Sequence, residues 1–257
     1  MCIAQDQEHH SHPSPAETTN VKCIWTWCGV LCLAALACSK SEKPMFFLAA
    51  SLADVATSWQ TEYGGGFDTH TGASLLLAQQ IRGGAEADLF LAAGASALTQ
   101  LLADGRLALV DSTYLRNRLV LITAADVEPP SDLSDLRDPR FARIAIADPE
   151  LAPAGGYARA GLKQAGLWDE LSPRFIYTGD VRMAAETIRL ATADAAFVYA
   201  TDAASLDIAA WPLDTTLFPM VAYPLAMLAP RGPAKDSLWD FLHSSKAREL
   251  AAAEGFQ

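Results

Sequence analysis

The chain has 257 residues, of which 51% are hydrophobic and 19% are charged, and its formal net charge is −11. This length and composition allow one large domain or two lobes with a buried core, and they exclude an intrinsically disordered chain. The negative charge argues against nucleic acid or an anionic membrane surface as a partner. An anionic ligand would have to be attracted by local fields, because the molecule as a whole repels it.

The first 38 residues hold all five cysteines, and the spacing of these cysteines does not match a zinc site. The apolar run 23–38 follows a single basic residue, Lys22, and is shorter than the ~20 residues of a bilayer span. It contains Ala-Leu-Ala, a small-residue cleavage pattern, just before Cys38. We therefore predict a secretory signal peptide over residues 21–37 and an exported mature protein.

The tripeptide before Cys38 also resembles a bacterial lipobox. This resemblance predicts a lipid on Cys38, a tether over residues 38–44, and a location in the periplasm or cell envelope, with the membrane reached only through that lipid. The first lipobox position is Ala rather than the usual Leu, so cleavage by an ordinary signal peptidase and an uncleaved membrane anchor are the alternatives.

Residues 1–20 are polar and acidic, whereas a signal peptide begins with a basic segment. We interpret them as an upstream extension that is disordered or wrongly assigned to the chain, in which case Val21 is the true start. A metal site built from His9, His10 and His12 is the weaker interpretation.

From residue 45 onward, short apolar runs alternate with helical periodicity, which is typical of α/β layers. The predicted strands are residues 45–50, 87–93, 118–124, 143–147, 174–177, 195–200 and 221–228. The predicted helices are residues 51–63, 74–82, 98–102, a segment from 153, 181–191, a segment from 201, and 237–254. Segment 66–71 occupies the place of a second strand but has little strand character, and Pro224 favours an edge or crossing segment.

The stretch 144–162, IAIADPELAPAGGYARAGL, reads as a strand, a turn of small residues and a helix start. Such a turn presents free backbone N–H groups to an anion, yet it contains no Lys or Arg. Other predicted strands end just before Ser51, Ser74 and Val181, and a further strand carries Tyr199. Ligands of open α/β sheets bind outside the carboxyl ends of the strands, so these positions predict an anion site made of neutral donors.

Taken alone, these side chains have ordinary structural interpretations. Ser51, followed three residues later by Asp54, has the pattern of a helix cap, and Ser74 is also a helix-cap candidate. Tyr199 lies between apolar residues and reads by default as a core tyrosine with a solvated hydroxyl.

Seven segments of the chain, in this order, resemble the molybdate-binding proteins of ABC transporters: AASLADVA, GASLLLAQQIRGGAEADLFLAA, RNRLVLI, IAIADPELAPAGGYARAGLKQAGLWDEL, DVRMAAETI, FVYATDA and YPLAML. The likeness covers nearly all of residues 45–255. It implies an α/β, two-lobed periplasmic-binding-protein fold of type II, in which each lobe is a mostly parallel sheet flanked by helices. Lobe 1 would comprise 45–118 and the return 225–257, lobe 2 would comprise 119–224, and crossings near 119–123 and 221–225 would form the hinge.

The resemblance also implies the ligand contacts, which fall on Ser51, Ser74, Ala154, Val181 and Tyr199. The three hydroxyls would donate hydrogen bonds, and backbone N–H groups around the first four positions would add to them. Molybdate or tungstate stays fully ionised near neutral pH and needs only donors, whereas a protonated anion such as phosphate would find no acceptor. Sulfate would have to be rejected by the size of the cage.

Three further residues lie near the predicted site. Asp68 and His70 fall in the segment that departs most from the family pattern, so we expect Asp68 to face solvent. His70 is either an exposed loop residue or a fourth side-chain donor that tunes uptake with pH. Arg182 either braces the start of its helix or is solvated.

The sequence thus predicts a non-enzymatic, monomeric solute-binding protein that has no cofactor and no metal other than the bound oxyanion. The resemblance alone implies that it would deliver molybdate or tungstate to an ABC transporter permease with its ATPase subunit. A binding protein for another oxyanion, such as sulfate, is the nearest alternative. A serine hydrolase would use Ser51 or Ser74 with His70 or His243 as base, although neither serine lies in Gly-x-Ser-x-Gly. The ligand-sensing domain of a transcription regulator is opposed by the export signal.

Overall fold

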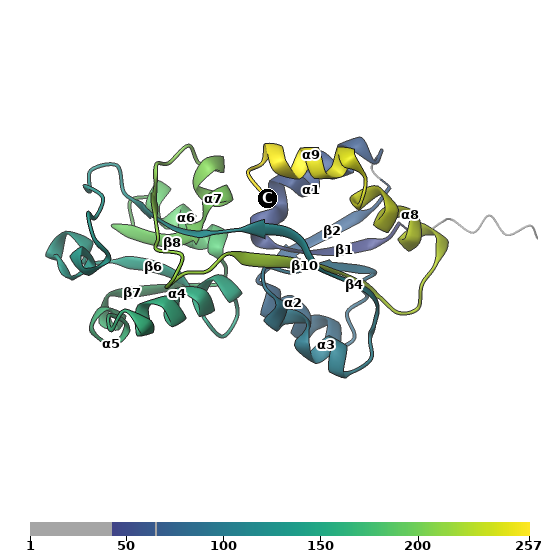
Figure 1. Ribbon diagram of the computed structural model, residues 1–257, viewed down its shortest axis with the longest axis horizontal. Helices are drawn as coiled ribbons and strands as arrows, with labels where there is room; N and C mark the ends of the chain where they lie inside the picture. Colours follow the sequence, from purple (N-terminus) through teal and green to yellow (C-terminus); the bar gives the residue numbers. More distant parts are fainter. Residues whose placement is uncertain (1–42, 65) are drawn as a thin grey trace, which may run out of the picture. The chain divides into compact units, whose positions relative to one another are not determined.

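The computed structural model describes residues 43–257 except residue 65, and it contains two five-stranded sheets flanked by helices (Figure 1). The predicted signal peptide, the upstream extension and Cys38 lie outside the described residues. Among the helices that are described, none combines the length and the apolar character needed to cross a membrane. The two-lobed α/β architecture predicted from the sequence is confirmed.

The sheet of lobe 1 has the strand order β2-β1-β3-β10-β4. Its strands are β1 (Met45–Ala49), β2 (Asp68–Gly72), β3 (Leu89–Leu91), β4 (Leu107–Asn117) and β10 (Val221–Leu228). β1 pairs with β2 and β3 in parallel, whereas β10 is antiparallel to β3 and β4. The helical segments are η1 (Ala50–Leu52), α1 (Ala53–Glu62), α2 (Ser74–Arg82), η2 (Ala95–Leu98), α3 (Thr99–Ala103), α8 (Pro233–Leu242) and α9 (Ser245–Ala253).

Strand β1 shows why this sheet needs helices on both faces. Phe46 and Leu48 belong to a core cluster with Trp59 of α1, whereas Phe47 belongs to a second cluster with Leu77 of α2. Successive side chains of a strand point to opposite faces, so an entirely apolar strand must be covered twice. Helices α1 and α9 lie on one side of the sheet, and α2 and α3 lie on the other (Figure 1).

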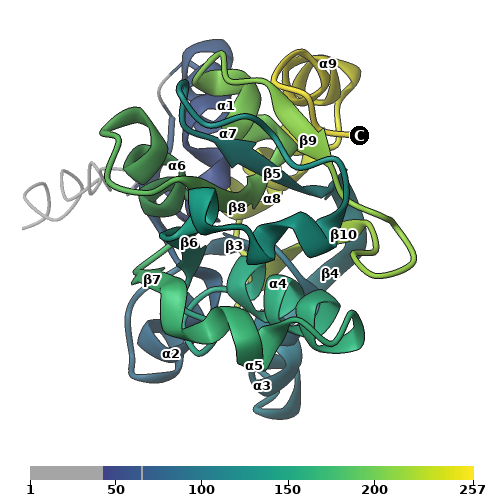
Figure 2. The ribbon, with the colours of Figure 1, turned by 90° about the vertical axis from the view of Figure 1, so that its left-hand side faces the viewer.

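The sheet of lobe 2 has the strand order β7-β6-β8-β5-β9. Its strands are β5 (Leu119–Thr123), β6 (Ile144–Ala147), β7 (Phe175–Thr178), β8 (Ala195–Tyr199) and β9 (Ala210–Pro212). β6 is parallel to β7 and β8, and β5 is antiparallel to β8 and β9. The helical segments are η3 (Leu133–Arg137), η4 (Pro139–Phe141), α4 (Pro153–Gln164), α5 (Trp168–Leu171), η5 (Ser172–Arg174), α6 (Val181–Arg189) and α7 (Ala200–Ser205). Figure 2 shows α6 and α7 on one side of this sheet and α4 and α5 on the other.

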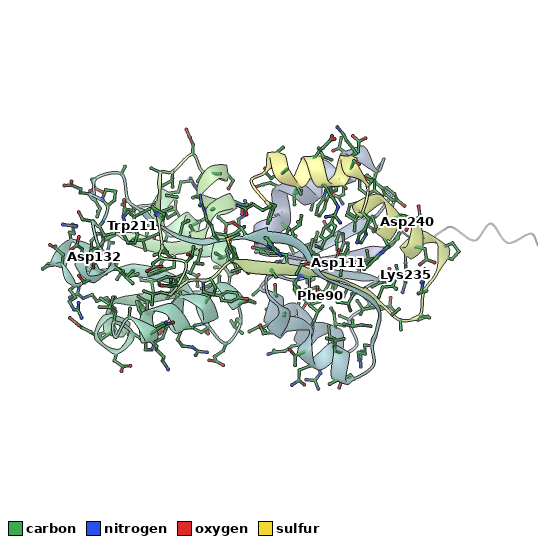
Figure 3. All side chains as sticks on the ribbon, in the orientation of Figure 1. Phe90, Asp111, Asp132, Trp211, Lys235 and Asp240 are labelled. Atoms are coloured by element: carbon green, nitrogen blue, oxygen red, sulfur yellow. The ribbon has the colours of Figure 1, made fainter. Side chains whose placement is uncertain are left out.

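Two connections join the sheets. Strand β4 ends at Asn117 and β5 begins at Leu119, so the chain passes from the first sheet to the second at Arg118. The return runs from β9 to β10, whose first residue, Val221, pairs with Asn117. Buried apolar residues such as Phe90 fill the lobes, while Asp132 and Asp240 are exposed (Figure 3). The exact lobe boundaries and the hinge motion stay predictions.

The expected second strand is present, whereas two other local predictions were wrong. Residues 68–72 form β2 in spite of their weak strand character, because this strand lies at the sheet edge and pairs only with β1, so its side chains need not be apolar. Pro224 lies in a strand that is paired on both sides, and the pairing with β4 shifts between Tyr223 and Leu225, where proline has no N–H to donate. The predicted closing helix is two helices, because the hydroxyl of Ser244 accepts a hydrogen bond from the N–H of Ala247 and starts α9.

Candidate functional site

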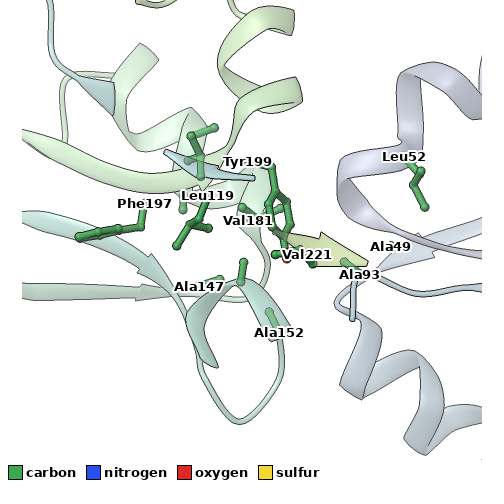
Figure 4. Packing of buried hydrophobic residues seen from close by; sticks show 14 of the residues in the cluster. Ala49, Leu52, Ala93, Leu119, Ala147, Ala152, Val181, Phe197, Tyr199 and Val221 are labelled. Carbon is green, nitrogen blue, oxygen red and sulfur yellow. The ribbon is translucent and has the colours of Figure 1, made fainter. Parts of the chain in front are cut away.

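A small cavity lies between the two lobes. In both sheets, the carboxyl ends of the parallel strands point toward this cavity. Figure 4 shows Tyr199 and Val181 of lobe 2 on one side of this region and Ala49 and Ala93 of lobe 1 on the other. The lining residues are Ala49, Ala50, Ser51, Gly72, Ala73, Ser74, Ala93, Ala152, Pro153, Ala154, Asp180, Val181 and Tyr199. All five residues predicted as ligand contacts are therefore brought together around one cavity.

The local sequence explains why main-chain donors gather here. Strands β1, β2, β6 and β7 are each followed closely by a helical segment, which begins at Ala50, Ser74, Pro153 and Val181 respectively. The N–H groups in the first turn of a helix have no partner within that helix, and the helix dipole places partial positive charge at the same end. The small residues of the turns leave these N–H groups accessible.

Close packing depends on glycine at one of these turns. A Cβ atom on Gly155 would lie 1.9 Å from the carbonyl oxygen of Ala147, the last residue of β6. Any side chain at position 155 would therefore push α4 away from the strand that it follows. The small-residue turn noted in the sequence thus lets the N-terminus of α4 approach the cavity.

Three buried hydroxyls complete the donor set. The Ser51 Oγ atom lies 3.0 Å from the Tyr223 hydroxyl oxygen. The Ser74 Oγ atom accepts a hydrogen bond of 3.0 Å from the N–H of Ala93. The Tyr199 hydroxyl is buried and has no hydrogen-bond partner among the described residues. Burial raises the pKa of Tyr199 well above its ordinary value, so this hydroxyl keeps its proton and is able to donate.

The helix-cap interpretation of the two serines was wrong. Ser51 lies inside η1 and Ser74 is the first residue of α2, and neither helix has a side-chain cap. Both hydroxyls instead make contacts outside their own helix, as described above. Tyr199 is 1% exposed, so its hydroxyl is not solvated as a default core tyrosine would require.

The cavity wall carries no lysine, arginine or histidine among its described lining residues, and its single carboxylate is already engaged. Asp180 caps α6, with its Oδ1 atom accepting a hydrogen bond of 2.9 Å from the N–H of Met183. The arrangement is therefore rich in neutral donors and poor in free acceptors.

A cationic side chain lies just behind the wall. Arg182 of α6 forms an ion pair with Asp54 of α1, which belongs to the other lobe, and a second ion pair of 3.0 Å with the buried Asp202. Arg182 is thus neither simply solvated nor only a brace for its own helix, because it joins the two lobes. Burial raises the pKa of Asp202 to about 7, against the lowering influence of Arg182.

The structure separates Asp68 and His70 from the cavity. Asp68 is exposed at the start of β2, as expected from the sequence. The His70 Nε2 atom lies 3.1 Å from Gln80 Oε1, and its ring packs on Phe47 with the centroids 4.8 Å apart. His70 is not among the lining residues, so the fourth-donor hypothesis is not supported.

No serine–histidine pair forms in the part of the chain that the structure describes. His243 contacts Asp111 and the carbonyl of Trp239, not Ser51 or Ser74. A general base must reach the hydroxyl that it activates, so the geometry opposes the hydrolase hypothesis.

Contacts between the lobes close the cavity. The N–H of Leu75 donates to the carbonyl of Leu151 over 3.1 Å, and the Tyr157 hydroxyl approaches Gly94. The cavity has a volume of only ≈ 10 Å³, enough for about one water molecule. Any larger ligand, a tetrahedral oxyanion included, therefore enters only when the lobes separate.

Sequence reasoning missed the residues behind the hydroxyls, above all Tyr223 and Asn117. For Tyr223 the available signal was a polar side chain within an apolar strand, YPLAML, whereas Asn117 ends a strand of mixed composition and gave no such signal. Such a side chain must find partners when it is buried, but the sequence does not say which ones.

The chain is similar to known proteins over most of its length. The family described as bacterial extracellular solute-binding protein matches residues 47–257. Molybdate-binding protein ModA of Escherichia coli is 30% identical over 241 residues, which are 87% of this chain and 92% of that protein. A putative ABC transporter substrate-binding lipoprotein of Bacillus subtilis, YvgL, is 32% identical over 192 residues, 72% of this chain and 73% of the relative. The solved substrate-binding domain of a putative molybdenum ABC transporter from Clostridium difficile has a TM-score of 0.64 and 28% identity, covering 84% of this chain and 99% of that chain.

Proposed function

We propose that this chain, which belongs to the bacterial extracellular solute-binding proteins and is 30% identical to molybdate-binding protein ModA of Escherichia coli, captures molybdate or tungstate between its lobes. It then delivers the anion to an ABC transporter permease with its ATPase subunit. Lobe 1 (45–118 and 225–257) and lobe 2 (119–224) close on the anion about the two connections between the sheets. The protein acts outside the cytoplasm as a binding protein, not as an enzyme.

One observation carries the proposal: the cavity offers donors from both lobes and contains no cationic side chain among its lining residues. Ser51 and Ser74 of lobe 1 and Tyr199 of lobe 2 supply hydroxyls, while the helix starts at Ala154 and Val181 supply N–H groups. A hydrogen bond to a charged group contributes about 1.5–3 kcal/mol. Several such bonds, fixed in place before the anion arrives, replace its hydration shell at little cost in reorganisation.

The same donor set explains why a dianion without protons is the best ligand. An anion that carries an O–H group would direct this hydrogen at another donor, and the repulsion would weaken its binding. Phosphate, which is partly protonated near neutral pH, is therefore disfavoured. Sulfate has the right charge and no proton, so it is the competing ligand, and the size of the closed cavity must discriminate against it.

Delivery to a membrane permease is consistent with the lipobox-like segment. A lipid on Cys38 would hold the binding protein at the membrane surface, and residues 38–44 would act as the tether. The residues that line the cavity all come from this one chain, and we propose that it acts as a monomer.

Thermal unfolding in the presence of single anions tests the ligand. The exported chain without its signal peptide would be unfolded with molybdate, tungstate, sulfate or phosphate. A ligand at about a thousand times its dissociation constant stabilises the folded state by ~4 kcal/mol, and we expect this shift with molybdate and tungstate. A shift with sulfate alone would keep the binding role and change the ligand.

The Ser51→Ala variant tests the site itself, because it removes one proposed ligand hydroxyl. Its stabilisation by molybdate should be smaller than that of the unaltered protein. Ser172→Ala, which removes a hydroxyl bonded to the carbonyl of Asp169 outside the cavity wall, should leave the stabilisation unchanged. If none of the four anions stabilises the unaltered protein, the proposed function is wrong.

A further inference from the structure

A cluster of buried polar side chains lies behind the Ser51 side of the cavity. It consists of Ser51, Asn117, Thr201 and Tyr223, which are at most 4% exposed. Asn117 and Tyr223 lie on the paired strands β4 and β10, and neither is among the residues that line the cavity. The Tyr223 hydroxyl oxygen is 3.0 Å from Ser51 Oγ, and Asn117 Nδ2 is 2.9 Å from Thr201 Oγ1 and 3.5 Å from the Tyr223 hydroxyl oxygen.

The orientation of the Asn117 amide follows from its main-chain neighbour. The N–H of Arg118 donates a hydrogen bond of 2.8 Å to Asn117 Oδ1. A backbone N–H only donates, so the amide oxygen must face Arg118 and the amide NH₂ must face away from it. The two N–H bonds of this NH₂ group are then directed at the hydroxyl oxygens of Thr201 and Tyr223.

The direction of the next hydrogen bond follows in the same way. By distance alone, either oxygen of the Ser51–Tyr223 pair could donate. The Tyr223 oxygen accepts from Asn117, and its buried hydroxyl hydrogen needs an acceptor, for which Ser51 Oγ lies 3.0 Å away, so we take Tyr223 as the donor. Burial raises the pKa of Tyr223, which keeps this hydrogen in place. Ser51 Oγ therefore acts as an acceptor toward Tyr223. With Tyr223 as the donor, the hydrogen of Ser51 is left to point into the cavity that Ser51 lines.

We infer that Tyr223 and Asn117 are positioning residues for anion selectivity, which fix the Ser51 hydroxyl as a donor toward the cavity. The inference rests on the proposed function, since it concerns which oxyanions this cavity accepts. The second serine is fixed by a different partner: the N–H of Ala93 donates to Ser74 Oγ, so Ser74 also has only its hydrogen to offer the ligand.

The hydrogen bond from Tyr223 makes the Ser51 hydroxyl selective for anions without a proton. A free serine hydroxyl rotates and can either donate to an anion or accept from it. A serine whose oxygen already accepts from Tyr223 is a poor acceptor for the O–H of a protonated anion. The selectivity between molybdate and monohydrogen phosphate therefore depends on side chains that touch neither anion.

The Tyr223→Phe variant tests the inference. Phenylalanine keeps the ring that packs edge-on against Tyr199 and Phe256, with centroids 5.7 and 5.4 Å away, and removes only the hydroxyl. The dissociation constants for molybdate, sulfate and phosphate would be measured by calorimetry, with competition for weak ligands, at a pH where phosphate is mostly a dianion with one proton. We expect molybdate to bind roughly tenfold more weakly and phosphate to bind as well as before or better, so the ratio of the two affinities falls.

The Asn117→Asp variant reverses the direction of the Asn117–Tyr223–Ser51 hydrogen bonds instead of removing one of them. A carboxylate at position 117 would accept from the Tyr223 hydroxyl, whose oxygen would then take the hydrogen of Ser51. The added negative charge weakens all dianions alike, so it cancels in the ratio of molybdate to monohydrogen phosphate affinity. This ratio should fall here as well.

Tyr114→Phe is the matched control, because the hydroxyl of this buried tyrosine on β4 donates to the carbonyl of Leu242 and not to the cavity. It should lower the melting temperature and leave the affinity ratio unchanged. Equal weakening of all three anions in Tyr223→Phe, or no change in the ratio, would overturn the inference while the proposed function stands. Failure of the unaltered protein to bind any of the three anions would overturn both.

Discussion

Single residues decide the charge balance around the cavity, and Asp202 is a fully buried carboxyl group among them. Its side chain is fully buried, and burial raises its pKa from 3.8 to about 7 even though Arg182 lies 3.0 Å away and lowers it. In the unfolded chain the same carboxyl titrates near its ordinary value. The folded protein therefore binds one more proton than the unfolded chain between about pH 4 and pH 7.

The pH dependence of stability follows from this difference. The contribution of Asp202 is fully present below about pH 4 and is lost as the pH rises through about 7, at up to about 1.4 kcal/mol per pH unit. Chemical denaturation over this range should show a falling free energy of unfolding, and Asp202→Asn should flatten the fall. Asp132→Asn is the control. The pKa of this exposed carboxyl is lowered by its hydrogen bonds with Ser134, so the group titrates below the range from about pH 4 to pH 7. An unchanged slope in Asp202→Asn would contradict the assignment.

At the same scale, the sequence could indicate some site residues and not others. The strand ends and small-residue turns predicted an anion site near these positions, and the resemblance to a family assigned the five individual contacts. The cap pattern at Ser51 has no counterpart in the structure. Tyr223 and Asn117 could not be found from the sequence, since their partners come from segments far away in the chain. Long-range hydrogen bonds leave no local pattern.

Among the elements, buried strands were the most predictable and edge strands the least. The strands β6 and β8 are apolar throughout because helices cover both of their faces, and this makes them visible in the sequence. Strand β2 has the burial pattern of an exposed edge, and the 11 residues of β4 alternate irregularly between exposed and buried positions. Main-chain pairing contributes much of the stability of such edge strands, and composition does not report it.

The loop between β3 and η2 and the first turns of α4 form the contact that we expect to be most sensitive to substitution. Gly94 has φ = 118°, and a Cβ atom there would lie 2.9 Å from the Tyr157 hydroxyl and 3.3 Å from Pro153 Cβ, both in the other lobe. Gly94→Ala should therefore oppose closure and weaken molybdate binding, by about tenfold if the clash and its relief cost ~1.4 kcal/mol. Titration calorimetry would measure the change.

Gly84→Ala separates the clash from the backbone strain. Gly84 has φ = 104°, so alanine is strained there too, but a Cβ atom would meet nothing within 4 Å. We expect a lower melting temperature with unchanged molybdate affinity. If both variants lose affinity equally, strain and not the contact between lobes is responsible.

For the whole molecule, the contacts between lobes describe a closed state that the anion should select. The lobes meet through the Leu75–Leu151 main-chain hydrogen bond and the Asp54–Arg182 ion pair, on opposite elements around the cavity. Neither contact involves the proposed anion, so some closure is possible without it. A ligand that binds both lobes shifts the balance further toward the closed form.

We therefore expect molybdate to reduce the radius of gyration measured by small-angle X-ray scattering, and phosphate to leave it unchanged.

The Asp54→Asn variant removes the ion pair between the lobes. Because the side chains of Arg182 and Asp54 are 27% and 44% exposed, this pair contributes only ~0.2–1 kcal/mol. The equilibrium of the ligand-free variant should thus shift about 1.4- to 5-fold toward open forms, more at low salt than at high salt. Glu150→Gln breaks a pair with Arg159 inside lobe 2 and should not change the scattering. Identical curves for all variants, with and without molybdate, would mean that the lobes do not move about their two connections and that the anion enters a rigid cavity.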